Sequence, residues 1–120
     1  MVIEDELFLL RTIAKEMKAA GINVLPCIGG KQAFSILSDG KQLPDAIWLD
    51  YYLRDTNGLE FMGKLKQQPS LEKIPVFVVS NTSDENIISS MALVGTEQYF
   101  IKTKHRLEDI IKTIKTHVSQ

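Results

Sequence analysis

The sequence has little cysteine, no long apolar run and no excess of either charge. Its one cysteine, Cys27, cannot form a disulfide within the chain, and we interpret it as a small apolar residue. With no signal peptide in view, we expect a reducing cytoplasm. No apolar stretch approaches the roughly 20 residues of a membrane span. The net charge of −1 argues against nucleic acid or anionic membranes as partners, because both attract positively charged surfaces.

The remaining composition is that of one globular domain. The length of 120 residues is close to the commonest domain size, and 44% hydrophobic with 24% charged residues are typical globular values. No repeat, linker or low-complexity tract divides the chain. We therefore predict a single domain over residues 1–120, with no DNA-binding or enzymatic output domain inside it.

Strand-like and helix-like segments alternate along the chain. Short apolar runs predict strands at residues 1–3, 22–28, 46–50, 76–80 and 98–101. Apolar residues at helical spacing predict helices at residues 7–20, 31–38, 59–68, 84–94 and 107–118. Ser83 is the predicted N-cap of the fourth helix. Pro26 places the second strand at a sheet edge, because proline has no N–H for the ladder.

This alternation predicts the α/β fold class. Strand-then-helix repeats with short connections favour a parallel sheet that is covered on both faces by right-handed crossovers. The expected fold is a flavodoxin-like doubly wound (βα)5 arrangement, with a five-stranded parallel sheet in the strand order 2-1-3-4-5. In such sheets ligands bind at the carboxyl ends of the strands.

Polar residues stand at the ends of four predicted strands. They are Glu4 and Asp5 after the first strand, Asp50 at the end of the third, Ser80 at the end of the fourth and Lys102 after the last. Each alone has an ordinary explanation, such as an acid at a helix start, a turn residue or a lysine at a sheet end. Because all of them fall on one rim of the sheet, they indicate a site.

The chemistry of this group favours a hard cation and a phosphoryl group. Mg²⁺ prefers oxygen ligands from one or two carboxylates together with waters and phosphate oxygens. Asp5 and Asp50 are the expected direct ligands, and Glu4 is expected to hold a metal-bound water. A free oxygen of Asp50 can act as a nucleophile and form an aspartyl phosphate. Lys102 and the Ser80 hydroxyl can each bind one of the phosphoryl oxygens.

Four segments resemble, in order and spacing, the signature of bacterial response-regulator receiver domains of two-component systems. They are Val2-Ile3-Glu4-Asp5-Glu6, Ile47-Trp48-Leu49-Asp50 with Asn57-Gly58 following, Val78-Val79-Ser80, and Tyr99-Phe100-Ile101-Lys102. The resemblance covers essentially the whole chain. It implies a Mg²⁺-dependent phosphorylation switch, with at most self-catalysed phosphorylation and dephosphorylation rather than an enzyme's turnover.

The resemblance also implies a role for each matched residue. Asp50 corresponds to the phosphoacceptor, Glu4 and Asp5 to the acidic pair, Ser80 to the switch hydroxyl, Tyr99 to the switch aromatic and Lys102 to the family's lysine. The backbone carbonyl of Tyr52 corresponds to a further metal ligand. Tyr52 and Thr82 match the two variable positions that flank the phosphoryl group and control access of water.

The family's partners follow in the same way. The phosphoryl donor is expected to be a histidine kinase or a histidine phosphotransfer protein. The surface of the fourth helix, last strand and fifth helix, around Ile87, Met91 and Tyr99, is expected to contact a target protein or form a homodimer. The sequence names neither kinase nor output, and the chain can be a stand-alone receiver or part of a larger regulator.

Three features depart from the family pattern. Thr103 follows the lysine where the family usually has proline in a cis bond, so the position of Lys102 is open. Asn81 stands where the family prefers alanine or glycine, and is expected to narrow the approach to the phosphoryl group. Only three residues precede Glu4, which makes the first strand shorter than usual.

Two alternative functions remain beside the receiver-domain hypothesis, and the tryptophan and the histidines have ordinary structural interpretations. A phosphoaspartyl hydrolase of the haloacid-dehalogenase type needs a second acid two residues after its nucleophile, where this chain has Tyr52. A flavodoxin-like interaction module is the other alternative, although acids after the first strand would repel a flavin phosphate. We interpret Trp48 as a core residue, and His105 and His117 as solvated surface residues.

Overall fold

Five strands and five helices alternate in the computed structural model, which describes residues 1–119. The strands are β1 (Val2–Ile3), β2 (Pro26–Cys27), β3 (Ile47–Leu49), β4 (Val76–Ser80) and β5 (Gln98–Ile101). The helices are α1 (Leu7–Ala19), α2 (Gly30–Asp39), α3 (Gly58–Lys66), α4 (Glu85–Leu93) and α5 (Leu107–Val118). Every strand pair is parallel, and the strand order is β2-β1-β3-β4-β5. The predicted doubly wound fold is confirmed.

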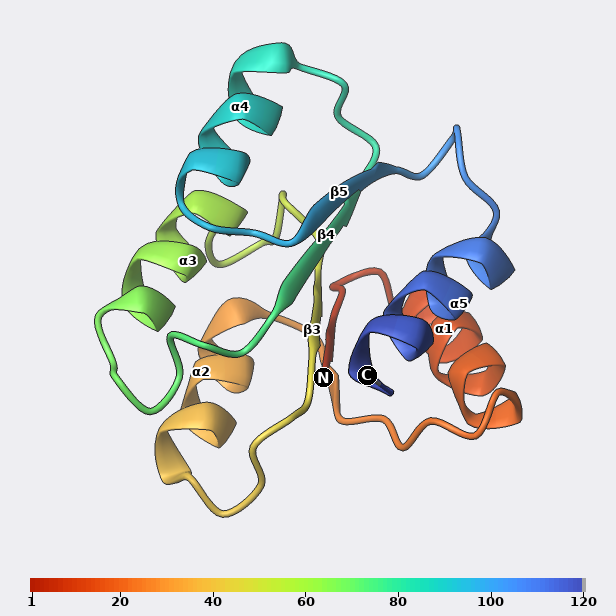
Figure 1. Cartoon of the computed structure of the whole chain (residues 1–120), viewed down its shortest axis with the longest axis horizontal. Helices are drawn as coiled ribbons and strands as arrows, with labels where there is room; N and C mark the ends of the chain where they lie inside the picture. The colour runs from red at the N-terminus through yellow and green to blue at the C-terminus, as the bar shows by residue number, and fades with distance from the viewer. Residues whose placement is uncertain (120) are drawn as a thin grey trace.

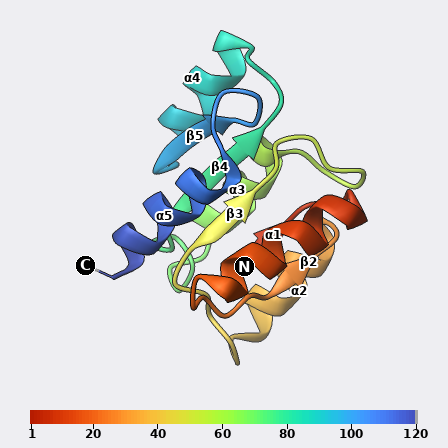
Figure 2. The ribbon, with the colours of Figure 1, turned by 90° about the vertical axis from the view of Figure 1, so that its right-hand side faces the viewer.

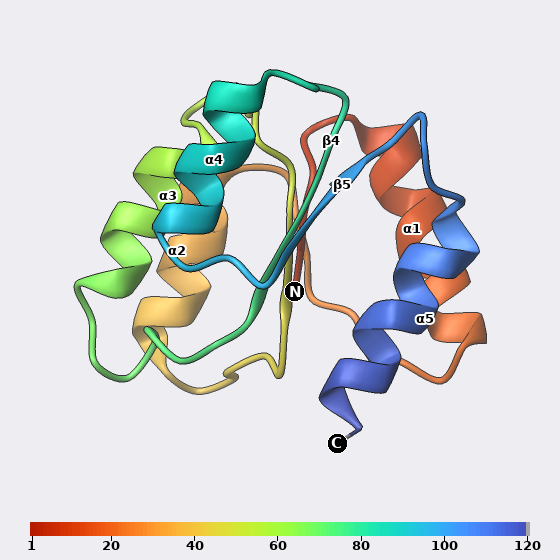
Figure 3. The same ribbon diagram turned by 45° about the horizontal axis from the view of Figure 1, so that its top comes forward.

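The helices form two layers, one on each face of the sheet (Figures 1 and 3). Helices α2, α3 and α4 cover one face, and α1 and α5 cover the other. Figure 2 looks onto the second face, where α1 and α5 lie side by side. Because strand side chains alternate between faces, Ile47 and Leu49 join the core under α2 to α4, whereas Trp48 joins the core under α1 and α5.

Three helices are capped at their N-termini by polar side chains, and one of these caps is not the predicted residue. The Glu6 carboxylate accepts the first free amides of α1, and the Asn57 side chain accepts that of Glu60 in α3. Helix α4 is capped by Asp84, which accepts the Asn86 N–H at 2.9 Å. The prediction of Ser83 as N-cap was therefore wrong by one residue. A carboxylate at this position also complements the positive end of the helix.

The second strand is much shorter than predicted. Only Pro26 and Cys27 pair with β1, although their place at the sheet edge is confirmed. On one side, the Ile22 N–H donates to the Met17 carbonyl at the end of α1. On the other, the Ile28 N–H donates to the Gln32 side chain of α2. At the two ends of residues 22–28, hydrogen bonds to the neighbouring helices thus replace the expected ladder, which remains only around Leu25 to Cys27.

Other expectations about individual residues are confirmed. Trp48 is 2% exposed and Cys27 is buried, so both are core residues. His105 and His117 are exposed, and their rings pack edge-on against aromatic residues of the sheet. Within residues 1–119, no helix has the length and apolar character needed to cross a membrane.

Candidate functional site

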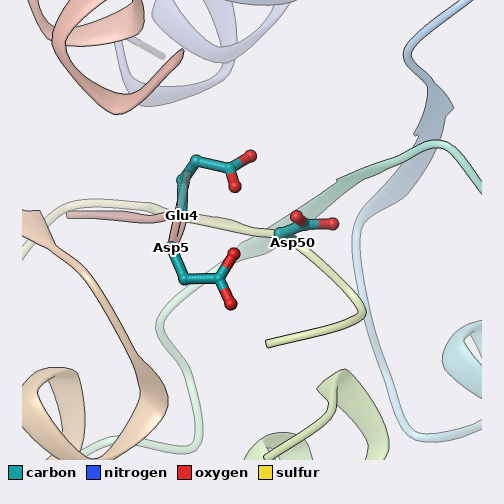
Figure 4. A group of neighbouring side chains, drawn as sticks. All are labelled: Glu4, Asp5 and Asp50. Carbon is teal, nitrogen blue, oxygen red and sulfur yellow. The ribbon is translucent and has the colours of Figure 1, made fainter. Parts of the chain in front are cut away.

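The acidic residues meet because β1 and β3 are neighbours in the sheet. Ile3 pairs with Leu49, and the Asp50 N–H donates to the Ile3 carbonyl at 3.1 Å, so the residues that follow both strands emerge together. Glu4, Asp5 and Asp50 each offer a carboxylate oxygen, and these oxygens all lie within 4.8 Å of one another (Figure 4). The sequence prediction of an acidic cluster at this rim is therefore matched by the geometry.

Lys102 joins the cluster from the far side of β4. Its Nζ lies 2.7 Å from Glu4 Oε1 and 3.4 Å from Asp50 Oδ2. The backbone N–H of Lys102 donates to the Ser80 carbonyl at 2.8 Å, which anchors the start of the loop after β5. Thr103 does not displace the lysine, and residues 1–119 contain no cis peptide bond. The side chain extends over the end of β4 and contacts both the carboxylate that follows β3 and the one that follows β1.

Burial and charge set the ionisation of this group. Burial raises the pKa of Asp50 from 3.8 to about 6, the Lys102 charge lowers it, and the Glu4 charge raises it. Burial alone would lower the pKa of Lys102, but the hydrogen bond to Glu4 and the charge of Asp50 outweigh it and raise that pKa. At neutral pH Asp50 is thus mainly a carboxylate beside a charged lysine.

The position of Asp5 depends on the loop between β3 and α3. The Arg54 backbone N–H donates to Asp5 Oδ2 at 2.7 Å, and the Arg54 guanidinium lies 4.0 Å from the same oxygen. The exposed side chain of Arg54 contributes little through such a solvent-screened pair, so the backbone bond is the main contact. Sequence reasoning missed it, because the donor is a main-chain group 49 residues away from the acid.

Ser80 and Tyr99 lie on the next two strands and share one intermediary. The Ser80 hydroxyl is buried and accepts the Thr82 N–H at 3.4 Å. The Tyr99 hydroxyl donates to the Thr82 carbonyl at 2.9 Å. The backbone of Thr82 therefore connects the residue expected to bind the phosphoryl group with the residue expected to switch.

Tyr52 lies two residues after Asp50, in the loop that follows β3. Its side chain is 60% exposed, and its ring packs edge-on against Tyr51 with the centroids 4.9 Å apart. Its backbone forms an isolated antiparallel bridge with Asn57. This bridge closes the loop after β3 and holds the segment that was expected to supply a carbonyl ligand.

The donor set fits a small divalent cation. Three carboxylates converge, two of them buried, and Lys102 balances only part of their charge. Hard oxygen donors in this number are the ligands that Mg²⁺ takes in proteins. Asp5 and Asp50 would hold the ion directly, and Glu4 is held back by its hydrogen bonds to Lys102 and to the Glu6 N–H.

A separate cavity of about 460 Å³ lies at the opposite ends of the strands. It is lined by apolar residues together with polar loop residues, among them Trp48, Ile114 and Asp45. The Trp48 Nε1 atom has no hydrogen-bond partner in the described part of the chain. The acidic cluster is not part of this cavity.

Fold and site together define a class of protein: a doubly wound parallel α/β domain with an acidic cluster and a lysine at the carboxyl ends of its strands. A family model for the response regulator receiver domain matches residues 1–115. The chain belongs to this family. Receiver domains are signalling switches, and this membership replaces the hydrolase and flavodoxin-like alternatives.

Similar proteins agree with this assignment. The phosphate regulon transcriptional regulatory protein PhoB of Rhizobium meliloti is 28% identical over 101 residues, which are 84% of this chain and 44% of PhoB. The chain thus spans less than half of that relative. Protein PilG of Pseudomonas aeruginosa is 26% identical over 118 residues, which are 98% of this chain and 85% of PilG.

A solved structure shows the same fold. The Mn²⁺-bound form of response regulator Rcp1 superimposes with a TM-score of 0.84 at 22% identity, over 96% of this chain and 89% of Rcp1. At this identity the likeness supports the architecture of five parallel strands and five helices. The positions of the site residues rest on the distances and hydrogen bonds given above.

Proposed function

We propose that Asp50 accepts a phosphoryl group from a phosphohistidine donor in a Mg²⁺-dependent reaction. The observation that carries this proposal is a buried carboxylate that lies 3.4 Å from Lys102 Nζ and within reach of Glu4 and Asp5. A structural ion pair would need one acid for the lysine, whereas this cluster has three. The excess of negative charge is suited to a cation and, with that cation bound, to an incoming phosphoryl group.

The transfer forms one bond and breaks one. A carboxylate oxygen of Asp50 attacks phosphorus, the phosphorus–nitrogen bond of the donor breaks, and its electron pair returns to the imidazole, which takes up a proton from water. Bound Mg²⁺ would supply charge neutralisation for the phosphoryl oxygens. Lys102 supplies the second positive charge and the Ser80 hydroxyl a hydrogen bond, so catalysis rests mainly on positioning and electrostatics.

The signal leaves the site through Thr82. A phosphoryl oxygen that draws the Ser80 hydroxyl toward itself competes with the bond between Ser80 and the Thr82 N–H. Movement of this segment shifts the Thr82 carbonyl that holds Tyr99. The bond between the phosphoryl group and Ser80 then supplies the difference in affinity that biases the two states.

The expected output surface is formed by α4, β5 and α5. Ile87 and Tyr99 are half-buried and fit this role. Met91 was also expected there, but it is fully buried in the core, because its place on α4 faces the sheet. Leu93, which is 87% exposed at the end of α4, provides the apolar contact instead. The proposed partners are a histidine kinase or phosphotransfer protein in the cytoplasm, and a target or second copy on this surface.

Intact-mass measurement tests the phosphorylation. The protein is incubated with acetyl phosphate and Mg²⁺, and we expect the mass of one added phosphoryl group. Asp50→Asn should gain none, and EDTA should abolish labelling of the natural sequence. Asp39→Asn, at the exposed end of α2, is the matched control and should be labelled normally. Equal labelling of Asp50→Asn would contradict the assignment.

A further inference from the structure

Helix α2 begins without a cap from its own segment. Its N-cap residue is Gly29, which has no side chain to accept a hydrogen bond. The first amides of the helix instead donate to Asp55, with Gly30 N to Oδ1 and Lys31 N to Oδ2 both at 3.0 Å. Asp55 belongs to the loop between β3 and α3. We refer to this contact of Asp55 with Gly30 and Lys31 as the Asp55 clamp.

Two glycines allow the loop to come this close to α2. A Cβ atom on Gly29 would lie 2.9 Å from Asp55 Oδ2, and one on Gly30 would lie 2.4 Å from Thr56 Cγ2. Both distances are too short for carbon. The hydrogen bonds from Lys31 and Gly30 also lower the pKa of Asp55, so it is ionised at neutral pH. A charged carboxylate that accepts two helix amides is a strong version of a helix cap.

The next residue along the same loop holds the acidic cluster. While Asp55 binds α2, the Arg54 N–H binds Asp5 Oδ2 at 2.7 Å. The loop is closed behind them by the bond from the Leu53 N–H to the Thr56 carbonyl and by the bridge between Tyr52 and Asn57. A groove of about 680 Å³ is lined by residues from both sides of this contact, which include Asp5, Gly29, Arg54 and Asp55.

We propose that Asp55 is a positioning residue for the metal site. By fixing the loop to the start of α2, it keeps the Arg54 amide on Asp5 and the Tyr52 backbone beside the cluster, and it links occupation of the site to the first turn of α2. Asp55 itself touches neither the metal nor the reacting atoms. The inference rests on the proposed function in one respect: the acidic cluster has to bind Mg²⁺.

Direct titration with MgCl₂, followed by calorimetry, measures this role without any transfer of phosphate. Residues that orient metal ligands typically change affinity by about tenfold or more when they are removed. We therefore expect the Kd for Mg²⁺ to rise about tenfold in Asp55→Ala, with a smaller rise in Asp55→Asn, which keeps an oxygen acceptor.

Two glycine variants separate positioning from charge and from helix stability. Gly30→Ala pushes the loop away through Thr56 without any change in charge, and should weaken Mg²⁺ binding as Asp55→Ala does. Gly40→Ala is the matched control at the other end of α2. Gly40 has a φ of 72°, and an added Cβ there meets nothing within 4 Å. That variant strains the helix by about 1 kcal/mol but should leave Mg²⁺ affinity unchanged.

The amide signals of Gly30 and Lys31 give a second measurement by NMR. In the natural sequence they should shift on Mg²⁺ addition, and in Asp55→Ala this response should be lost. If Asp55→Ala and Gly30→Ala bind Mg²⁺ as tightly as Gly40→Ala, the clamp is only a helix cap and the inference is overturned. That result leaves labelling of Asp50 intact. If the natural sequence binds no Mg²⁺, both this inference and the proposed function are overturned.

Discussion

Two halves of the site are held by different kinds of interaction. In the acceptor half, defined as Glu4, Asp5, Asp50 and Lys102, the lysine contacts Glu4 at 2.7 Å and Asp50 at 3.4 Å. The Asp5 carboxylate is held from outside by a backbone N–H at 2.7 Å. The switch half, defined as Ser80, Thr82 and Tyr99, is joined by neutral hydrogen bonds of 3.4 and 2.9 Å. Charge-assisted bonds are roughly twice as strong as neutral ones. The comparison indicates that the acceptor half keeps its geometry while the switch half can rearrange at small cost.

Among the variants proposed here, Lys102→Ala should have the largest effect on stability, because it removes the cation of the acceptor half. Lys102→Ala leaves Glu4 and Asp50 as buried neighbouring carboxylates without a cation, so the free energy of unfolding should fall by about 3 kcal/mol at pH 8. At pH 5 the loss should be smaller, because protonated Asp50 no longer repels Glu4. Urea unfolding at the two pH values measures this. Lys104→Ala, an exposed neighbour, should change stability by less than about 0.5 kcal/mol.

A loss that is equal at pH 5 and pH 8 would mean that the lysine acts through packing. The contrast between the two halves would then not rest on charge. In either case we expect Lys102→Ala to fold and to lose the spectral response to beryllofluoride, since the transferred group loses its cationic support.

Asp50→Asn should stabilise the protein in a pH-dependent way. The folded-state pKa of Asp50 is about 6, above its usual 3.8, so stability falls as the pH rises from about 3.8 to about 6, and the full cost is present above that range. Asparagine avoids this cost. The variant should gain about 1–3 kcal/mol above pH 7, and the gain should disappear below pH 4. Thermal unfolding across this range would show a pH-independent difference if burial of the charge were not the cause.

Tyr99→Phe tests whether the switch half rearranges through the hydrogen bond of the Tyr99 hydroxyl. It removes the bond from the Tyr99 hydroxyl to the Thr82 carbonyl and should cost about 1 kcal/mol, with labelling of Asp50 unchanged. NMR shift mapping with beryllofluoride should show weaker changes in residues 84–94 than in the natural sequence. Tyr52→Phe is the control at an exposed hydroxyl. Full changes in residues 84–94 of Tyr99→Phe would exclude this bond from the signal path.

Tyr52→Ala should have the smallest effect on stability and a visible one on kinetics. The exposed side chain contributes less than about 0.5 kcal/mol, but we propose that it shields the acyl phosphate on the nearby Asp50 from water. We expect the phosphoryl lifetime to change severalfold while the urea midpoint stays nearly constant. A lifetime equal to that of the natural sequence would mean that Tyr52 points away from the phosphoryl group.

Much of the fold could be predicted from local patterns. The runs that end at Asp50 and Ser80 are continuous apolar segments and predict strands. Pro26 indicated that the second strand lies at the sheet edge. Predictions failed at the limits of elements, where single hydrogen bonds at a helix end decide which residues belong to the helix or the strand. Ile22 and Ile28 bind to the neighbouring helices on either side of β2. The N-cap of α4 is Asp84 rather than Ser83, because the Asp84 side chain accepts the Asn86 N–H.

The sequence by itself determined the doubly wound architecture and the meeting of Glu4, Asp5 and Asp50, because parallel neighbouring strands carry their ends to one rim. Only the tertiary structure decided how these acids are held. Lys102 pairs with Glu4 across 98 positions of the chain, and the contacts of Arg54 with Asp5 and of Asp55 with α2 use backbone amides. Every residue except proline carries the same amide. The identity of a residue in the sequence therefore does not indicate whether its backbone amide will donate to a distant carboxylate.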